Sequence, residues 1–90
     1  MSRSNTVFIG RKPVLNYVLA CMTLFKSGQD EVLVKARGRS ISTAVDVVEV
    51  IRNRYMQDVK VGGISIDTKA LTNQDGRTSN VSTIEIKINK

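Results

Sequence analysis

Two hydrophobic periodicities alternate along this chain, and their order restricts the folds open to it. Near the C-terminus Ile84, Ile86 and Ile88 alternate with polar residues, the period-two pattern of a strand with one buried face. Residues 14–25 and 41–55 instead repeat apolar side chains every three or four positions, which is the spacing of a helix. The chain therefore mixes strands and helices, and each element is short enough for one small domain.

The first helical pattern is bounded by recognisable signals. Pro13 suits the first turn of a helix, where its missing N–H is not needed, and Gly28 supplies a stop. Between them Val18, Cys21 and Phe25 fall on one line, and Leu15, Leu19 and Met22 fall on the next. So much of this helix is apolar that we expect it to pack on two sides, against a sheet and against something else.

The second helical pattern runs to about residue 55. We predict Ser40 or Ser42 as its capping residue, because serine oxygens accept the free N–H groups of a first turn. Val47 and Val50 widen the inner stripe of this helix. The stripe itself is predicted to comprise Ile41, Val45, Val48, Ile51 and Tyr55.

Four segments have strand character, and they give the order β-α-β-α-β-β. The segments are residues 5–9, residues 31–37, a stretch from about residue 59, and the C-terminal alternation. Val32, Leu33 and Val34 in succession predict a central strand covered on both faces. We therefore expect a single α+β domain of two layers over residues 1–90, with residues 1–5 flexible.

The last two strands are predicted to continue into a hairpin arm over residues 69–81. Asp75-Gly76 is a strong hairpin signal, and the segment has too few apolar residues to join a core. At about 3.3 Å per residue such an arm projects about 15–20 Å from the body. A disordered loop is the alternative interpretation of the same polar segment.

The residue inventory argues against an enzyme and indicates no cofactor. The chain has no histidine and one cysteine, and its eight acidic residues are scattered without the pairing that acid–base catalysis or a divalent metal needs. Cys21 lies in an apolar segment and is interpreted as a packing thiol, with a reactive role as the alternative. The N-terminus has no signal-peptide pattern, so a cytoplasmic or nucleoid-associated protein is expected.

The net charge of +6 is concentrated in the first half of the chain. Residues 1–45 contain seven Lys or Arg against two acids, whereas residues 46–90 contain seven against six. Arg11-Lys12 precedes the first helix, and Arg37-Gly38-Arg39 precedes the second. Residues i and i+2 of an extended chain point the same way, so Arg37 and Arg39 are expected to face one surface. Both helix starts follow strand ends, so we expect the two basic loops at one edge of the sheet, where phosphates would bind. Ordinary solvated loops are the alternative.

The remaining cations and aromatic residues give weaker indications. Arg52 has Glu49 three positions before it and is expected to form a surface ion pair with it. No role is assigned to Arg54. Lys69 and Arg77 make the predicted arm lightly cationic, which suits a DNA minor groove. No interleaved set of aromatic residues indicates stacking on single-stranded bases, so backbone contact with little sequence readout is expected.

Three motifs, in this order, resemble the Alba family of archaeal DNA- and RNA-binding chromatin proteins. The resemblance covers residues 5–90. The motifs are Ile-Gly-Arg-Lys-Pro-Val-Leu-Asn-Tyr-Val at 9–18, Val-Lys-Ala-Arg-Gly-Arg-Ser-Ile-Ser at 34–42, and Asn-Gln-Asp-Gly-Arg with Val-Ser-Thr-Ile-Glu-Ile at 73–77 and 81–86.

The resemblance implies a two-fold homodimer that holds double-stranded DNA through the basic loops, with its arms along the minor groove. Members of the family also bind RNA. By motif position, the implied nucleic-acid-binding residues are Arg11, Lys12, Asn16, Tyr17, Arg37, Arg39 and Arg77. Tyr55 takes the position of an aromatic residue that contributes to dimer–dimer contact in relatives.

Two positions depart from the family pattern. Arg11 stands where the family often has a lysine that is acetylated in some members, so any such control would act on Lys12. Asn80 stands where relatives commonly have arginine, which implies weaker binding by the arm. An RNA-binding accessory protein of a ribonucleoprotein and a protein-interaction adaptor are the alternative functions.

Overall fold

The computed structural model describes residues 5–90, and its elements follow the predicted order. The predicted flexible N-terminus falls outside the described residues except for Asn5, whose side chain donates a hydrogen bond to the Glu31 carbonyl (3.2 Å). The strands are β1 (Thr6–Phe8), β2 (Glu31–Arg37), β3 (Lys60–Thr72) and β4 (Thr78–Asn89). The helices are α1 (Val14–Lys26) and α2 (Ile41–Val50), the latter extended by a π-helical turn, Ile51–Tyr55.

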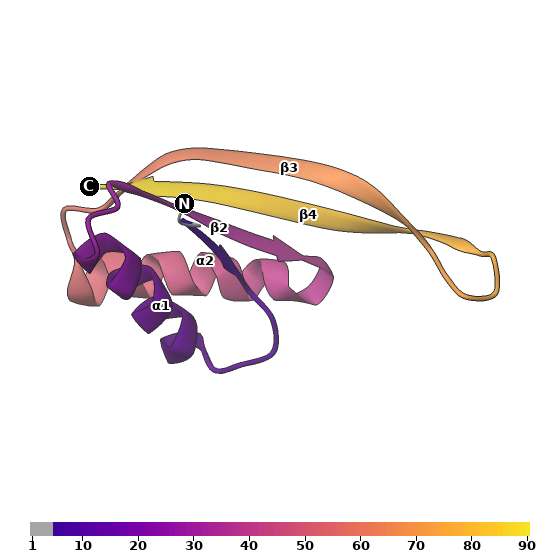
Figure 1. Cartoon of the computed structure of the whole chain (residues 1–90), viewed down its shortest axis with the longest axis horizontal. Coiled ribbons are helices and arrows are strands. Elements are labelled where there is room, and N and C mark those ends of the chain that lie inside the picture. Colours follow the sequence, from indigo (N-terminus) through magenta and orange to yellow (C-terminus); the bar gives the residue numbers. More distant parts are fainter. Residues whose placement is uncertain (1–4) are drawn as a thin grey trace.

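The four strands form one sheet in the order β1-β2-β4-β3. Strands β1 and β2 are parallel, with Phe8 opposite Lys35, and the other two pairs are antiparallel. Both helices lie on the same side of this sheet (Figure 1). The result is a two-layer α+β domain with extents of 45 × 31 × 23 Å, as predicted.

The core lies between the sheet and the helices, and it uses alternate residues of β2. Val32, Val34 and Ala36 are buried, whereas Leu33 and Lys35 are half-buried on the other side. The prediction is therefore right about the central position of this strand and wrong about the cover on both of its faces. The strand is central in its sheet, but only one layer of helices exists among residues 5–90, so its second face stays open.

Helix α1 buries the line that its periodicity predicted. Val18, Cys21 and Phe25 are at most 1 % exposed, while Leu15 and Leu19 remain 54 % and 62 % exposed. The chain turns after the helix at Gly28, at a φ of 107°. One apolar side of α1 thus packs in the core and a second is uncovered in the single chain.

Helix α2 is rotated relative to the predicted stripe. Ala44, Val47, Val48 and Ile51 are buried, at the i, i+3, i+4, i+7 spacing of a core-facing helix. Val45 and Tyr55, which were predicted to be inside, are 43 % and 50 % exposed. Val45 lies about 100° around the helix from Ala44. The π-helical turn widens the last turn, so Tyr55 leaves the buried face.

The predicted serine cap is wrong. Ser40 stands at the N-cap of α2 but makes no capping hydrogen bond, and Ser42 lies inside the helix. A 3-10 turn, Gly38–Ser40, leads into α2 and gives Ser40 helical backbone angles (φ −81°, ψ −5°). A capping side chain needs extended backbone to reach the free N–H groups, so the 3-10 turn removes the cap.

The predicted arm is a paired hairpin that extends past the helices (Figure 1). The pairing continues from Lys69 opposite Val81 to Thr72 opposite Thr78, and Gly76 turns the chain at a φ of 83°. Every residue of the arm is exposed except Leu71 and Val81, which are half-buried. Its stability comes from strand pairing, which excludes the disordered-loop alternative.

Cys21 is a fully buried packing residue of α1. Its burial raises the pKa of the thiol to about 12, so the thiol is protonated at neutral pH. Among residues 5–90 no helix has the length and hydropathy needed to cross a membrane.

Candidate nucleic-acid interface

The first basic loop, residues 10–13, is held by the hydroxyl of Tyr17. This oxygen accepts hydrogen bonds from the backbone N–H groups of Gly10 (2.9 Å) and Lys12 (3.0 Å). Tyr17 is 8 % exposed and packs in the core. Arg11 and Lys12 are exposed, and neither forms an ion pair with a described residue. Tyr17 thus fixes the loop backbone while both cations stay free.

We expect Tyr17→Phe to lower the free energy of unfolding by about 1–2 kcal/mol, because two loop N–H groups lose their acceptor. Urea denaturation of the two proteins measures the difference. Tyr55→Phe is the matched control, since Tyr55 is half exposed and its hydroxyl has no hydrogen-bond partner in the described chain. It should change stability by less than about 0.5 kcal/mol. Equal effects of the two substitutions would contradict the role given to the Tyr17 hydroxyl.

The second basic loop follows β2 directly. Arg37 is the last residue of that strand, and Gly38 turns the chain at a φ of 56°, which an L side chain rarely adopts. The sequence-based reason for placing Arg37 and Arg39 on one surface assumed extended backbone. That reason is wrong, because Arg39 lies in the 3-10 turn. Both arginines are nevertheless exposed and free of ion pairs with described residues.

The strand register brings the two loops to the same edge of the sheet. Strands β1 and β2 are parallel, and the Ile9 N–H donates to the Lys35 carbonyl at 2.8 Å. Arg11 follows Ile9 by two residues, and Arg37 follows Lys35 by two. We call the edge formed by Arg11, Lys12, Arg37 and Arg39 the basic edge. The predicted convergence of the two loops is confirmed.

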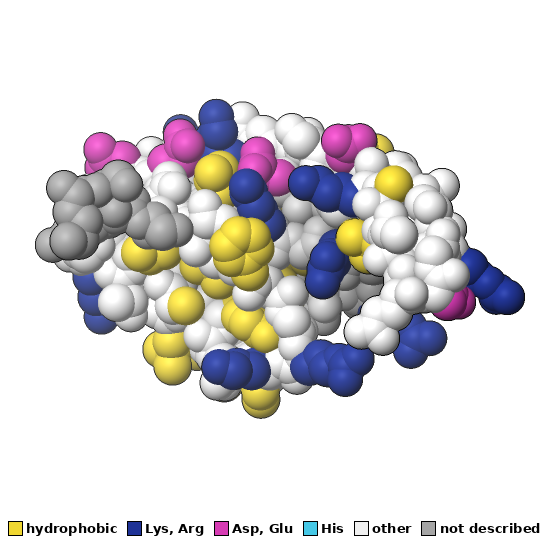
Figure 2. Space-filling model, turned by 45° about the vertical axis from the view of Figure 1, so that its right-hand side comes forward, with side chains coloured by type: hydrophobic (Ala, Val, Ile, Leu, Met, Phe, Trp, Pro, Cys, Tyr) yellow, Lys and Arg dark blue, Asp and Glu magenta, His cyan; other side chains and the backbone are white. Residues whose placement is uncertain are grey.

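The arm begins at the basic edge. Arg37 is opposite Thr83 of β4, and a Cβ atom placed on Gly38 would lie 3.8 Å from Val81 Cγ1 at the base of the arm. In Figure 2 Lys and Arg side chains gather beside the hairpin, whereas Asp and Glu side chains lie mainly along the upper edge. The excess positive charge is thus concentrated where both loops and the arm meet.

Arg77, at the tip of the arm, is paired within the hairpin. Its Nε lies 3.5 Å from Asp75 Oδ2, and its backbone N–H donates to Asp75 Oδ1 at 3.0 Å. The Arg77 side chain is 84 % exposed, so this ion pair contributes little to stability. Asn80 lies opposite Ala70 in the same hairpin and adds no charge.

The remaining predicted residues lie in different places. Asn16 is exposed in the first turn of α1, next to the first basic loop. Arg52 pairs with Glu49 at 3.2 Å, as its spacing predicted, and Arg54 is exposed. Tyr55 lines a groove between α1 and α2 with Leu15, away from the sheet. Residues 5–90 contain no cluster of acidic, histidine or cysteine side chains that could hold a metal ion.

Sequence reasoning missed the open face of the sheet. Phe8 was assigned to the first strand, but it is 72 % exposed and stands over a hollow lined also by Lys35 and Lys69. The available signal was the alternation of Val7 with Phe8, which places them on opposite faces. A strand of three residues is too short for that alternation to show which face is covered.

Comparison with known proteins gives the family of the chain. The model of the Alba family matches residues 5–68. The chain belongs to the Alba family. A curated "DNA/RNA-binding protein Alba" from Methanocella arvoryzae is 51 % identical over 86 residues, which cover 96 % of this chain and 90 % of that protein.

Solved Alba structures share the fold. Alba from Thermoplasma volcanium is 44 % identical and superimposes with a TM-score of 0.88, covering 94 % of this chain and 99 % of that one. ALBA1 from Trypanosoma brucei is 30 % identical with a TM-score of 0.80, covering all of this chain and 72 % of that one. The predicted family and the Alba fold are thus both confirmed.

Proposed function

We propose that this Alba-family chain is a dimeric architectural protein that binds double-stranded DNA through its phosphate backbone, with low sequence specificity. The observation that supports this proposal is the basic edge. Its four exposed cations have no ion-pair partner among the described residues and lie beside two helix starts. Free N–H groups at a helix start favour anions, and each cation adds a phosphate contact. The name of the Methanocella arvoryzae relative, which includes DNA and RNA, agrees with this function.

The arms supply the second part of the proposed contact. A paired hairpin of mostly exposed polar residues is narrow enough to follow a minor groove, and Lys69 and Arg77 give it positive charge. Nothing in the arm offers a rigid set of side chains for reading base edges. Arm contacts therefore depend on groove width and phosphate proximity, which accounts for low sequence specificity.

The dimer is proposed from an uncovered apolar strip on the helix side of β3. Ile64 and Ile66 are 60 % and 80 % exposed, although their partners on β4, Ile86 and Ile84, lie on the core side of the sheet. Helix α2 packs against β2 and β4 and leaves β3 uncovered. Val45 of this helix is exposed on the side that faces away from α1. A second copy would cover this strip, since uncovered apolar edge strands favour association.

Dimerisation also organises the binding surface. A two-fold axis beside β3 would double the number of basic edges and give one arm to each side. Eight loop cations per dimer fall within the six to ten phosphate contacts of strongly salt-dependent DNA binding. The same cations would also contact the phosphates of an A-form RNA duplex, which is why RNA binding is the second candidate function.

Competition between duplex DNA and duplex RNA for the protein, repeated over a salt series, tests these functions. Architectural DNA binding predicts a preference for DNA that is the same for unrelated sequences. A preference for RNA at every salt concentration would replace the first candidate with the second.

A further inference from the structure

The face of the sheet opposite the helices carries a row of side chains from all four strands. The register places Phe8 beside Lys35, Lys35 beside Glu85, and Glu85 beside Ser65. One step nearer the arm, Arg37, Thr83 and Asp67 form the next row. Because both helices lie on the other side, no described element covers these rows (Figure 1).

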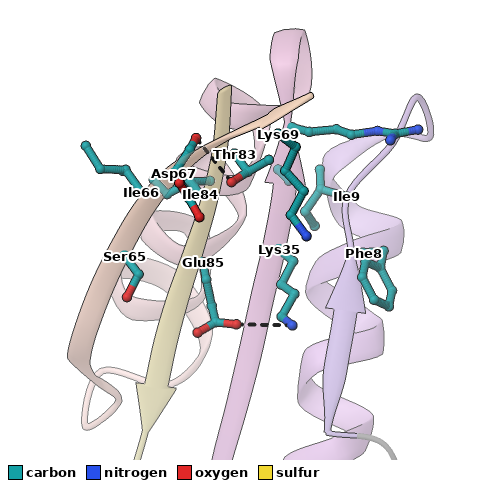
Figure 3. Close-up of a pocket in the computed structure, with 12 residues that line it drawn as sticks. Phe8, Ile9, Lys35, Ser65, Ile66, Asp67, Lys69, Thr83, Ile84 and Glu85 are labelled. Carbon is teal, nitrogen blue, oxygen red and sulfur yellow. Dashed lines mark hydrogen bonds and ion pairs between the residues drawn. The ribbon is translucent and has the colours of Figure 1, made fainter. Parts of the chain in front are cut away.

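These rows enclose a hollow of about 610 Å³. Phe8 and Lys35 form one wall, and Lys69 reaches in from the base of the arm, above Lys35 and beside Ile9 (Figure 3). The volume lies within the range of about 300–1,000 Å³ typical of small-ligand sites. The hollow is large enough for a nucleotide and open enough for a chain to enter and leave.

The charges in the hollow favour an anion. Lys35 is already paired with Glu85 at 3.1 Å, and the Asp67 carboxylate accepts a hydrogen bond from the Thr68 N–H at 2.7 Å. Arg37 and Lys69 have no ion-pair partner in the described chain. The lining therefore carries three cations against two acids, a net charge of +1, and the two cations without an ion-pair partner lie on the side of the hollow nearest the basic edge.

Phe8 supplies an exposed aromatic ring in the same hollow. It is 72 % exposed, and it stands on an edge strand where one side of the ring is open. Aromatic rings on open sheets stack on unpaired nucleic-acid bases, and neighbouring cations hold the phosphates. Bases inside a duplex are already stacked and paired, so they cannot use such a ring.

We propose that this face is a second nucleic-acid site, which takes one or two unpaired nucleotides of a single strand. A base stacks on Phe8, and the adjoining phosphates contact Arg37 and Lys69. Arg37 borders both this hollow and the basic edge, so a strand leaving a bound duplex can enter the site directly.

Phe8→Trp gives a direct reporter of stacking, because the chain has no other tryptophan. An eight-nucleotide oligothymidylate should quench its fluorescence, whereas a blunt duplex of the same length should leave it nearly unchanged. Quenching by the duplex alone, or by neither probe, would overturn the single-strand site.

Phe8→Ala should weaken binding of the same oligonucleotide by about 5- to 150-fold, which is the range for losing one base–aromatic stack. Phe8→Tyr should retain the affinity, and both variants should bind duplex DNA as the wild type does. Unchanged single-strand affinity in Phe8→Ala would refute the site, as would an equal loss for duplex.

Sedimentation of Phe8→Ala separates a nucleic-acid site from a protein interface. The variant should keep the oligomeric state of the wild type, and a changed state would assign this face to a second copy. Duplex binding by the wild type is measured in the same series. If the wild type failed to bind duplex DNA, the proposed architectural function would be contradicted. Quenching of Phe8→Trp by the single strand would still support the single-strand site.

Discussion

Removing Lys12 and Arg39 together should weaken duplex DNA binding about four-thousandfold at 0.1 M salt, equally for unrelated sequences. One phosphate contact contributes a factor of about eight at this salt, because the logarithm of affinity changes by about 0.9 per contact and per tenfold salt. A dimer of Lys12→Ala/Arg39→Ala loses four contacts. Titration of labelled duplexes by fluorescence anisotropy measures the loss.

Lys26→Ala/Lys60→Ala is the matched control, since it removes the same charge from the other end of the domain. Lys26 ends α1, and Lys60 is opposite Asn89 at the start of β3, so both lie far from the basic edge. This variant should lose less than about tenfold, through general electrostatics alone. A similar loss in both variants would mean that total charge, rather than the basic edge, determines binding. A loss that depends on sequence would indicate base readout.

Ile64→Glu should convert the protein to a monomer and raise its dissociation constant for dimers by about a thousandfold or more. Ile64 is one of the two exposed isoleucines of the uncovered strip on β3, and two-fold symmetry would bury the new carboxylate twice. Burying an unpaired charge costs several kcal/mol, and each 1.4 kcal/mol corresponds to a tenfold change. Sedimentation velocity over a concentration series measures the equilibrium.

Ser65→Glu adds the same charge to the neighbouring residue, on the open face of β3. It should leave the oligomeric state unchanged. Duplex affinity of Ile64→Glu should fall together with dimerisation, because one chain presents only half of the loop cations. A fully dimeric Ile64→Glu protein would place the interface elsewhere and remove the proposed role of the strip.

The order of elements and the edge that carries the basic loops could be predicted from the sequence. Both follow from local periodicity and from one geometric rule, that parallel strands end at the same edge. The arm was also predictable, because Asp75-Gly76 fixes a turn between two polar strands. The family resemblance added the expectation of a dimer, which no local pattern in the sequence indicates.

Other features depend on contacts that a single segment does not encode. Helix α2 has apolar residues around more than half its circumference, so its rotation is decided by packing on the sheet and by the π-helical turn. The predicted serine cap is absent because a 3-10 turn precedes α2 and gives Ser40 helical backbone angles. The role of Tyr17 depends on two backbone N–H groups that a folded loop brings to one oxygen. Phe8 was missed because its exposure follows from the absence of a second layer over the described sheet.

The salt dependence of duplex DNA binding by the wild-type protein tests the central claim most directly. Phosphate contacts by the loops of a dimer predict a linear plot of log affinity against log salt, with a slope near −0.9 per contact. For about six to ten contacts, affinity should fall about 10³- to 10⁵-fold between 50 and 200 mM salt. A slope near zero would show that the basic edge does not hold phosphates and would contradict the proposed function.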